Sequence, residues 1–351
     1  MSSPDTYGFG IIGTGMIAEF HAQAIASIER ACLVSVYSRS EDRARAFAAK
    51  VGGKPCWNLD TFFSDRELDV VTICTPSGFH LEPTVAAAKY GKHVICEKPL
   101  EVTLDRIDQM IDAHKQSGTT LGAIFNSRYE PVNQALKKLI GTGRLGRITY
   151  GGGYVPWWRP QQYYDQGGWK GTRKYDGGGA LMNQGTHTVD LLQWLMGEKV
   201  KRVTAFTALL GHTGLEVEDT AAAALQFEGG ALGVLFATTA TQPGLKARVE
   251  IAGTGGTLIS ESTYLKFLKF SEPLPADEEL IQRFGMSTVS DGSSDPRAIS
   301  ADKHRRNFEA FIRALDTHTD PELDGKEARK AVQIVLAVYE SAKTGRAVEL
   351  D

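Results

Sequence analysis

Two segments of the sequence carry residues suited to proton transfer at a hydroxyl group. Lys98 ends the apolar run HVICEK, and a partly desolvated lysine at a strand end could exchange a proton with a substrate hydroxyl. His187 lies in the predicted helix of GGGALMNQGTHTVDLLQWLMG, and Asn183 stands four residues earlier, on the same face of an α-helix. A histidine can take the proton of a hydroxyl, and an asparagine can orient a hydroxyl or the imidazole. The pattern leaves open that Lys98 is a surface charge and His187 a structural histidine.

No metal site is predicted from the spacing of possible ligands. His187 and Asp190 would supply two ligands from one helix, and no third ligand follows at a defined spacing. The four cysteines form no CxxC pair, which favours free thiols over a zinc site or a disulfide framework.

Aromatic residues gather between positions 154 and 175, which hold three of the five tryptophans and four of the eleven tyrosines. Aromatic faces with interleaved hydrogen-bonding groups suit a polyhydroxylated ring, which has apolar C–H faces and polar edges. The same composition suits an oligomer interface, and both interpretations stay open. The substrate contacts that we expect in this segment are Tyr154, Trp158, Arg159, Tyr164 and Arg173.

The segment GFGIIGTGMIA has the glycine spacing of a dinucleotide-binding loop. Gly13 permits a tight turn, Gly15 lets the backbone approach a pyrophosphate, and the small Ala18 allows close packing between helix and strand. The motif joins a predicted strand to a predicted helix, which is the context that such a loop requires. The sequence therefore predicts that a dinucleotide binds here.

The choice between NAD and NADP depends on the end of the second strand. An NAD site usually has an acidic residue there, about 20 residues after the glycine motif. This sequence has Ser38 and Arg39, with Arg43 close by, and arginine can pair with a 2'-phosphate. We expect an NAD(P) cofactor, with NADP favoured over NAD, although both arginines could be solvated charges. The other expected cofactor contacts are Thr14, Met16, Ile17, Thr75, Pro76, His80, Glu97, Lys98, Asn126 and Trp169.

The elements that would position these residues differ between the two parts of the chain. Short apolar runs alternate with amphipathic stretches through residues 1–125, which predicts a doubly wound α/β domain with a parallel sheet. Over 126–351, consecutive strands are joined by Gly-rich turns, with helices before and after them. This pattern predicts a second, α+β domain with an antiparallel sheet.

Composition and charge exclude several classes of partner. The 351 residues have a formal net charge of -3 and no block of like charge, so nucleic acid is not expected as a partner. No stretch approaches the roughly 18 apolar residues of a membrane-spanning helix. The first residues fit neither a secretory signal nor a transit peptide, so we expect a cytoplasmic protein.

Three segments together resemble the Gfo/Idh/MocA oxidoreductases, the family of glucose-fructose oxidoreductase and inositol dehydrogenase. They are GFGIIGTGMIA, TPSGFHLEPTVAAAKYGKHVICEKPL and GGGALMNQGTHTVDLLQWLMG, and VEDTAAAALQFEGGALG and ARVEIAGTGGTLI are similar to the family's C-terminal sheet. The resemblance implies a Rossmann domain followed by a domain with a large, mostly antiparallel sheet, through which dimers or tetramers form. It also implies that Lys98 lies beside the nicotinamide and the substrate hydroxyl, and that His187 is the catalytic histidine.

The resemblance also bears on the substrate. Inositol dehydrogenases carry an aspartate where this chain has Asn183, which puts a carboxylate-assisted relay in doubt. Asn183 and the segment WRPQQYYDQGGWKGT look more like members that act on sugar nucleotides or glycosides, such as the UDP-N-acetylglucosaminuronate 3-dehydrogenases. We therefore expect hydride transfer between the cofactor and a secondary hydroxyl or ketone of a sugar or sugar derivative. The alternatives are an NAD-dependent glycosidase with transient oxidation, a dihydrodiol dehydrogenase, and a dinucleotide-binding sensor without turnover.

Overall fold

A computed structural model describes residues 5–285 and 301–350, and these form two compact units. The first unit contains the described residues up to Asn126 together with 301–329, and the second contains 127–285 together with 330–350. The division after Asn126 lies one residue from the boundary expected between 125 and 126.

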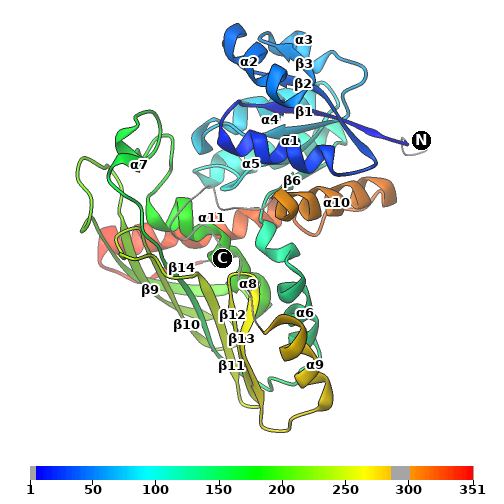
Figure 1. Ribbon diagram of the computed structural model, residues 1–351. Coiled ribbons are helices and arrows are strands. Elements are labelled where there is room, and N and C mark those ends of the chain that lie inside the picture. The colour runs from blue at the N-terminus through cyan, green and yellow to red at the C-terminus, as the bar shows by residue number, and fades with distance from the viewer. Residues whose placement is uncertain (1–4, 286–300, 351) are drawn as a thin grey trace. The chain divides into compact units, whose positions relative to one another are not determined.

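The first unit is built on a six-stranded sheet in the order β3-β2-β1-β4-β5-β6, in which every described pair of strands is parallel (Figure 1). Its strands are β1 (Tyr7–Ile12), β2 (Ala31–Tyr37), β3 (Lys54–Cys56), β4 (Val70–Ile73), β5 (His93–Cys96) and β6 (Leu121–Ala123). The chain changes direction across the sheet between β1 and β4, and open α/β sheets bind ligands at the carboxyl ends of the strands beside such a point. This sheet confirms the predicted doubly wound α/β fold.

Helices connect these strands, and side-chain caps fix where several of them begin. They are α1 (Met16–Ala26), α2 (Glu41–Val51), α3 (Leu59–Phe63), η1 (Ser77–Phe79), α4 (Leu81–Lys89) and α5 (Leu104–Ser117). Ser40, Asn58 and Thr103 each accept a hydrogen bond from the backbone N–H three residues later, at the starts of α2, α3 and α5.

Helix α10 (Ala301–Thr317) also belongs to the first unit, which corrects the expectation that 126–351 forms one continuous domain. The physical reason is its apolar face. Phe308, Phe311, Ile312 and Leu315 are buried in the same core as residues of α1 and β1. An amphipathic helix can pack on any exposed apolar face, and the sequence pattern does not say which one. Helix α11 (Gly325–Thr344) contains the division between the units, after Arg329.

The second unit is built on an eight-stranded sheet in the order β13-β12-β11-β7-β10-β9-β8-β14. The strands are β7 (Ile148–Pro156), β8 (Val200–Ala208), β9 (Thr220–Phe227), β10 (Leu232–Thr238), β11 (Arg248–Gly253), β12 (Gly256–Glu261), β13 (Tyr264–Phe270) and β14 (Val348–Glu349). Strands β7 and β10 pair in parallel, and the other described pairs are antiparallel. The predicted mostly antiparallel sheet is confirmed.

Helix α8 (Thr186–Met196) packs on one face of this sheet (Figure 1). Strand β7 has glycines where the helix comes close. A Cβ atom on Gly151 would lie 2.6 Å from the sulfur of Met196, and one on Gly153 would lie 3.1 Å from Thr188. The other helical segments of this part of the chain are η2 (Asn126–Tyr129), α6 (Pro131–Gly141), α7 (Gln162–Asp165), the π-helix η3 (Ala180–Gly185) and α9 (Pro275–Phe284). Within the described ranges, no helix combines the length and the apolar character that crossing a membrane requires.

Candidate functional site

The loop between β1 and α1 has the shape that a pyrophosphate requires. Gly13 has a φ of +110°, and a Cβ atom there would lie 2.7 Å from the carbonyl oxygen of Cys74, so only glycine fits. Gly15 precedes the first turn of α1, is exposed, and has no atom within 4 Å of the place of a Cβ. Ala18 is fully buried against the sheet. The open backbone at the start of a helix suits an anion, so these residues fit the pyrophosphate of a dinucleotide.

Ser38, Arg39 and Arg43 follow the carboxyl end of β2, beside this loop. The N–H of Gly13 donates to the carbonyl oxygen of Tyr37, the last residue of β2, at 3.0 Å. The Arg39 guanidinium lies 5.9 Å from the centre of the Phe79 ring, and Arg43 is exposed in the first turn of α2. Side chains that could contact the ribose are therefore near the glycine loop in the fold.

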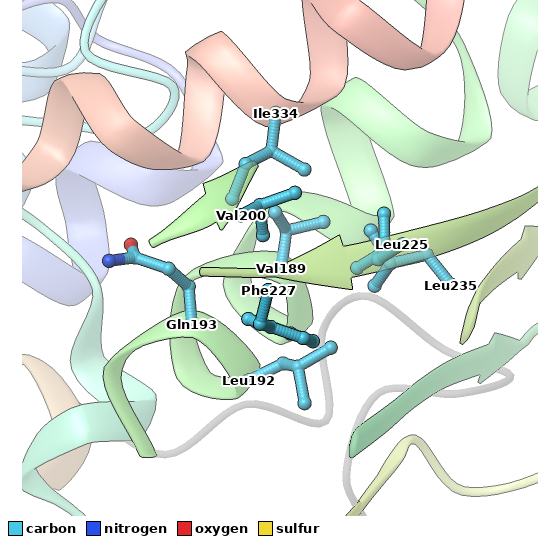
Figure 2. Close-up of a pocket in the computed structure, with 8 residues that line it drawn as sticks. All are labelled: Val189, Leu192, Gln193, Val200, Leu225, Phe227, Leu235 and Ile334. Carbon is cyan, nitrogen blue, oxygen red and sulfur yellow. The ribbon is translucent and has the colours of Figure 1, made fainter. Parts of the chain in front are cut away.

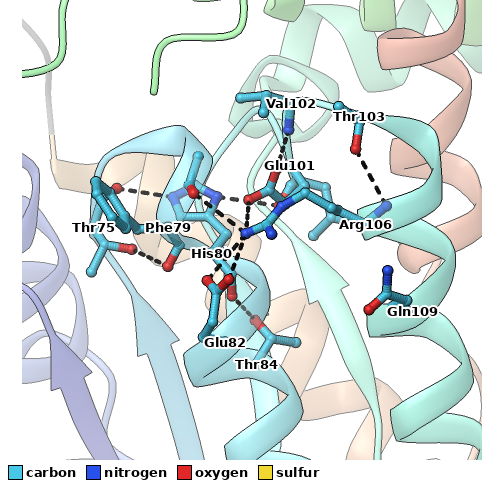
Figure 3. A network of polar contacts seen from close by, with 12 residues as sticks. Thr75, Phe79, His80, Glu82, Thr84, Glu101, Val102, Thr103, Arg106 and Gln109 are labelled. Carbon is cyan, nitrogen blue, oxygen red and sulfur yellow. Dashed lines mark hydrogen bonds and ion pairs between the residues drawn. The ribbon is translucent and has the colours of Figure 1, made fainter. Parts of the chain in front are cut away.

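His80 fastens the turn after β4 to the turn after β5 (Figure 3). Its imidazole is buried, with Nδ1 3.0 Å from the carbonyl oxygen of Pro99 and Nε2 2.9 Å from that of Thr75. A cofactor atom could bond either ring nitrogen only by displacing one of these contacts. The structure therefore gives His80 a supporting role in the loops that carry Thr75, Pro76 and Lys98, and its predicted contact with the cofactor stays a prediction.

The buried carboxylate of Glu101 holds the segment after Lys98, and the sequence pattern did not reveal this role. The Glu101 carboxylate is fully buried, accepts a hydrogen bond from the N–H of Val102 at 2.5 Å, and lies 3.1 Å from the Arg106 guanidinium (Figure 3). Arg106 also pairs with Glu82 of α4 at 2.9 Å. This network ties the start of α5 to α4 and supports the turn that follows β5.

Glu97, the residue before Lys98, is held by two buried histidines. Its Oε1 lies 2.8 Å from Nε2 of His21 in α1 and 3.3 Å from Nε2 of His304 in α10, and its Oε2 accepts from the N–H of Lys98 at 3.0 Å. Burial opposes ionisation, yet the hydrogen bonds from the two imidazoles hold the pKa of the Glu97 carboxyl well below its usual range. Burial lowers the pKa of His21. No pattern in the sequence pointed to His21 or His304, because they come from helices that are distant from Glu97 along the chain.

The same three side chains bring their ligand atoms within 4.8 Å of one another, so they could in principle hold a metal ion. Hydrogen bonds already account for this arrangement, because the two imidazoles face one carboxylate oxygen at donor–acceptor distances. Nδ1 of His21 lies 2.7 Å from the Thr72 hydroxyl, which completes its hydrogen bonding. The absence of a metal from the protein stays a prediction.

Three of the remaining expected residues lie near the ends of elements or in the loops between them. Lys98 is half-buried and follows β5, at the same edge of the sheet as the glycine loop. Asn126 is buried at the start of η2. Trp169 is half-buried in the second unit, between α7 and η3, and its carbonyl oxygen accepts from the Thr172 hydroxyl at 2.6 Å.

In the second unit, Asn183 and His187 lie on either side of a junction between two kinds of helix. Asn183 belongs to the π-helix η3, and His187 lies in the first turn of α8. The α-helical spacing from which a shared face was expected therefore does not apply across this junction, and the shared face stays a prediction. The Nδ2 of Asn183 donates to Oδ1 of Asp176 at 2.7 Å, and the other oxygen of Asp176 accepts from the N–H of Gly171 at 2.9 Å.

Asp190 takes no part in the hydrogen bonds that join Asn183, Asp176 and Gly171. Its carboxylate pairs with the Arg128 guanidinium through contacts of 2.6 and 2.7 Å, and both side chains are fully buried. The ion pair ties α8 to η2, so Asp190 has a structural role.

In the aromatic segment, two of the side chains that were expected to contact the substrate form hydrogen bonds within the protein. Tyr164 is buried, and its hydroxyl lies 2.9 Å from that of Thr239. Arg159 is also buried and donates to the carbonyl oxygen of Trp158 at 2.7 Å. Trp158 is half-buried, and the exposed Arg173 donates to the carbonyl oxygen of Glu216 at 2.9 Å. Trp158 and Arg173 are therefore the more accessible of these four.

Tyr154 lies on the face of β7 opposite to the face that α8 covers. Gly152, its neighbour on that face, has the rings of Tyr150 and Tyr154 beside the place of a Cβ, whereas Gly151 and Gly153 face α8. The Tyr154 ring also has the Arg248 guanidinium 4.2 Å from its centre. The structure therefore does not bring Tyr154 together with Asn183 and His187.

Three residues that sequence reasoning missed connect the aromatic segment to η3. The Tyr163 hydroxyl lies 3.4 Å from Nε2 of Gln184, which follows Asn183, and the Lys170 ammonium lies 3.7 Å from the centre of the Tyr163 ring. Burial lowers the pKa of Lys170. The only signal in the sequence was the aromatic and polar composition of the segment.

A small space between α8 and the sheet is lined by apolar side chains and Gln193, and Figure 2 shows them around it. They include Val189, Leu192 and Phe227. A polyhydroxylated ligand needs several converging polar groups, which this lining does not offer. We therefore regard the space as a packing gap in the core.

Comparison with protein families gives two matches that together cover most of the chain. Residues 7–125 match the model described as "Oxidoreductase family, NAD-binding Rossmann fold". Residues 133–259 match the model described as "GFO/IDH/MocA C-terminal domain".

Individual relatives cover nearly the whole chain. The WlbA dehydrogenase from Bordetella pertussis, whose crystal structure contains NADH and UDP-GlcNAcA, is 32% identical and has a TM-score of 0.89, with 99% of each chain covered. The 1,5-anhydro-D-fructose reductase of Ensifer adhaerens is 27% identical, with 98% of each chain covered. The myo-inositol 2-dehydrogenase of Thermotoga maritima is 27% identical, covering 97% of this chain and 98% of the relative.

Proposed function

Because the chain belongs to the GFO/IDH/MocA oxidoreductase family, we propose that it oxidises a secondary hydroxyl of a sugar or sugar derivative, or reduces the corresponding ketone. One observation carries the proposal. The Gly13–Gly15 loop and Lys98 both lie at the carboxyl edge of one parallel sheet, where α/β folds bind their ligands. A dinucleotide loop and a candidate proton-exchanging group therefore occur at the same edge.

The cofactor in this proposal is NAD(P), with NADP favoured. When bound, the nicotinamide would exchange a hydride with the substrate carbon. The backbone at Gly13 and Gly15 would hold the pyrophosphate, and Ser38 and Arg39 would contact the ribose. The absence of a carboxylate from position 38 supports the preference for NADP, since nothing there would repel a 2'-phosphate.

We assign proton chemistry to Lys98 and His187. Lys98 would donate a hydrogen bond to the reacting oxygen. His187 would take the proton of the substrate hydroxyl while the carbon that carries this hydroxyl gives up a hydride. Asn183, whose Nδ2 donates to Asp176, would orient a substrate hydroxyl. The resemblance to the family supports the roles of Lys98 and His187.

Within the sugar derivatives, a nucleotide sugar with an acidic group is the favoured substrate class. The relative with bound UDP-GlcNAcA supports it, and so do the cationic Lys170 and Arg173 among aromatic rings. A simple pyranose, a glycoside or a cyclitol is the second candidate, supported by the anhydrofructose reductase and the inositol dehydrogenase.

We further propose that the protein is a homo-oligomer, dimer or tetramer, formed through the sheet of the second unit. The face opposite α8 carries large exposed apolar side chains, with Phe206 79% exposed and Leu232 60% exposed. Such a patch on a sheet face favours contact with a second copy of the chain.

The test is turnover by the purified protein with NAD or NADP and a panel of nucleotide sugars, pyranoses, glycosides, cyclitols and dihydrodiols. We expect reduced nicotinamide, followed by its absorbance, with at least one sugar derivative. Lys98→Met and His187→Ala should each lower kcat by at least about a hundredfold, because general acid–base groups contribute about 10² to 10⁴ in rate. Lys89→Met, which changes an exposed lysine of α4, is the matched control.

Other outcomes would identify the alternatives. Aglycone release without net reduction indicates the glycosidase, and turnover of a dihydrodiol alone indicates that dehydrogenase. Cofactor binding without turnover across the panel indicates the sensor. If His187→Ala keeps kcat while Lys98→Met abolishes it, the base is Lys98 and the role assigned to His187 is wrong.

A further inference from the structure

The first turn of η3 has backbone N–H groups that no acceptor within the helix can reach, as at the start of every helix. Here, one residue takes three of the donors. Glu218 accepts from the N–H of Gly179 through Oε2 and from that of Leu181 through Oε1, both at 2.9 Å. Its carbonyl oxygen accepts from the N–H of Ala180 at 3.1 Å. Glu218 therefore caps the π-helix with both its side chain and its backbone.

Tyr339 of α11 takes the next donor and binds the same carboxylate. Its hydroxyl accepts from the N–H of Met182 at 3.2 Å and donates to Oε1 of Glu218 at 2.9 Å. The four consecutive donors of residues 179–182 therefore all have partners on Glu218 or Tyr339. Two residues that are far from η3 in the sequence form one connected cap.

The glycines before η3 make room for this cap. A Cβ atom on Gly179 would lie 1.6 Å from the carbonyl oxygen of Glu218, and one on Gly178 would lie 2.2 Å from the Tyr339 hydroxyl. Both positions need a residue without a side chain. The glycine run that the sequence places before the helix thus has a packing reason.

The cap is electrostatically consistent although it is buried. Burial raises the pKa of the Glu218 carboxyl, and it raises that of the Tyr339 hydroxyl well above its usual value. Every group that bonds the carboxylate oxygens is a donor, so the ionised carboxylate fits the site and the Tyr339 hydroxyl stays protonated.

We propose that Glu218 and Tyr339 are positioning residues that hold η3 in its π-helical form and thereby set the relative orientation of Asn183 and His187. This inference rests on the catalytic roles proposed above. π-helical turns are rare and occur often at functional sites. If η3 relaxed to α-helical bonding, residues on its two sides would rotate by about one residue position, roughly 100°, relative to each other. Asn183, inside η3, and His187, after it, would then lose the relative orientation that the cap holds.

The experiment compares Tyr339→Phe and Glu218→Gln with the wild-type protein by hydrogen exchange of the segment 179–187 and by steady-state kinetics. Tyr339→Phe removes the hydroxyl alone, so exchange of this segment should become at least about tenfold faster. The kcat should fall at least about tenfold while the affinity for the cofactor, measured by calorimetry, stays unchanged. Glu218→Gln keeps the size of the side chain and one acceptor oxygen, and should show the same changes.

The matched control is Tyr7→Phe, which removes another buried tyrosine hydroxyl, bonded to Asp316 at 3.0 Å in the first unit. It should leave exchange of residues 179–187 and kcat unchanged. Unchanged exchange in both cap variants would overturn the inference, and so would faster exchange with an unchanged kcat. His187→Ala separates the two proposals. If this variant keeps full kcat, the proposed role of His187 fails. If it loses kcat while Tyr339→Phe and Glu218→Gln keep theirs, only the positioning role of Glu218 and Tyr339 is overturned.

Discussion

At the residue scale, the side chains chosen for their chemistry differ in how free they are to meet a ligand. His80, Glu97 and Arg159 are buried, and their polar atoms contact backbone or side-chain groups of the protein itself. Ser38 and Lys98 are partly exposed at strand ends. A polar residue in a motif can therefore shape the site or touch the ligand, and its contacts in the fold decide between the two.

Cofactor choice is a prediction at this scale. Ser38→Asp places a carboxylate at the end of β2, beside the loop that we propose holds the pyrophosphate. It should weaken NADP binding at least about tenfold by repelling the 2'-phosphate, while NAD binding survives or improves. Titration calorimetry with both cofactors measures the change. Equal affinities for NADP before and after the substitution would remove Ser38 from the cofactor site.

At the element scale, the positions of Asn183 and His187 in the second unit depend on how η2, η3 and α8 are fixed. Helix α8 follows η3 without a break, so support at either segment reaches His187. The Arg128–Asp190 pair fixes α8 to η2, and the Arg128 guanidinium also lies 5.6 Å from the centre of the Trp194 ring. A buried ion pair that loses one partner leaves an uncompensated charge, which is costly.

Asp190→Asn should therefore lower the free energy of unfolding by about 3 kcal/mol or more, because the buried Arg128 loses its counter-charge. Chemical denaturation followed by circular dichroism measures the loss. The matched control is Asp108→Asn, whose partner Arg329 is part of a partly exposed pair, and it should cost about 1 kcal/mol or less. Equal losses in the two variants would contradict the structural role of Asp190.

At the scale of the whole molecule, the sheet of the second unit has one face covered by α8 and another that is open in the single chain. A row of residues crosses four strands on the open face, with Phe206 opposite Ala222, Ala222 opposite Phe236, and Phe236 opposite Tyr154. Tyr154 thus belongs with the proposed interface, where its aromatic ring would also be buried.

Phe206→Glu should dissociate the proposed oligomer, because it places a charge on the apolar face that the oligomer would bury. Light scattering coupled to size-exclusion chromatography should give a smaller molar mass for the variant than for the wild-type protein. Leu274→Glu, at a half-exposed position at the start of α9, is the control and should leave the mass unchanged. A wild-type protein that elutes as a monomer of 38.2 kDa would refute the oligomer.

The sequence by itself determined the features that depend on neighbouring residues. The Gly13–Gly15 turn, the alternation of strands and helices in the first unit and the short antiparallel strands of the second were all predicted, because each follows from local conformational preferences and hydrophobic periodicity. The family followed from the same motifs. Lys98 and His187 could be predicted as candidates because a residue's type and its neighbours along the chain can be read from one short segment.

Only the tertiary structure decided which distant groups meet. His304 is more than 200 residues from Glu97, α10 returns to the first unit, and Glu218 and Tyr339 cap η3 from other elements. The π-helical form of η3, which contains Asn183, is a further feature that the α-helical pattern of the sequence did not predict. The physical reason is that such contacts depend on burial and hydrogen bonding between segments that the folded chain brings together, which leave no periodic trace in the sequence of either segment.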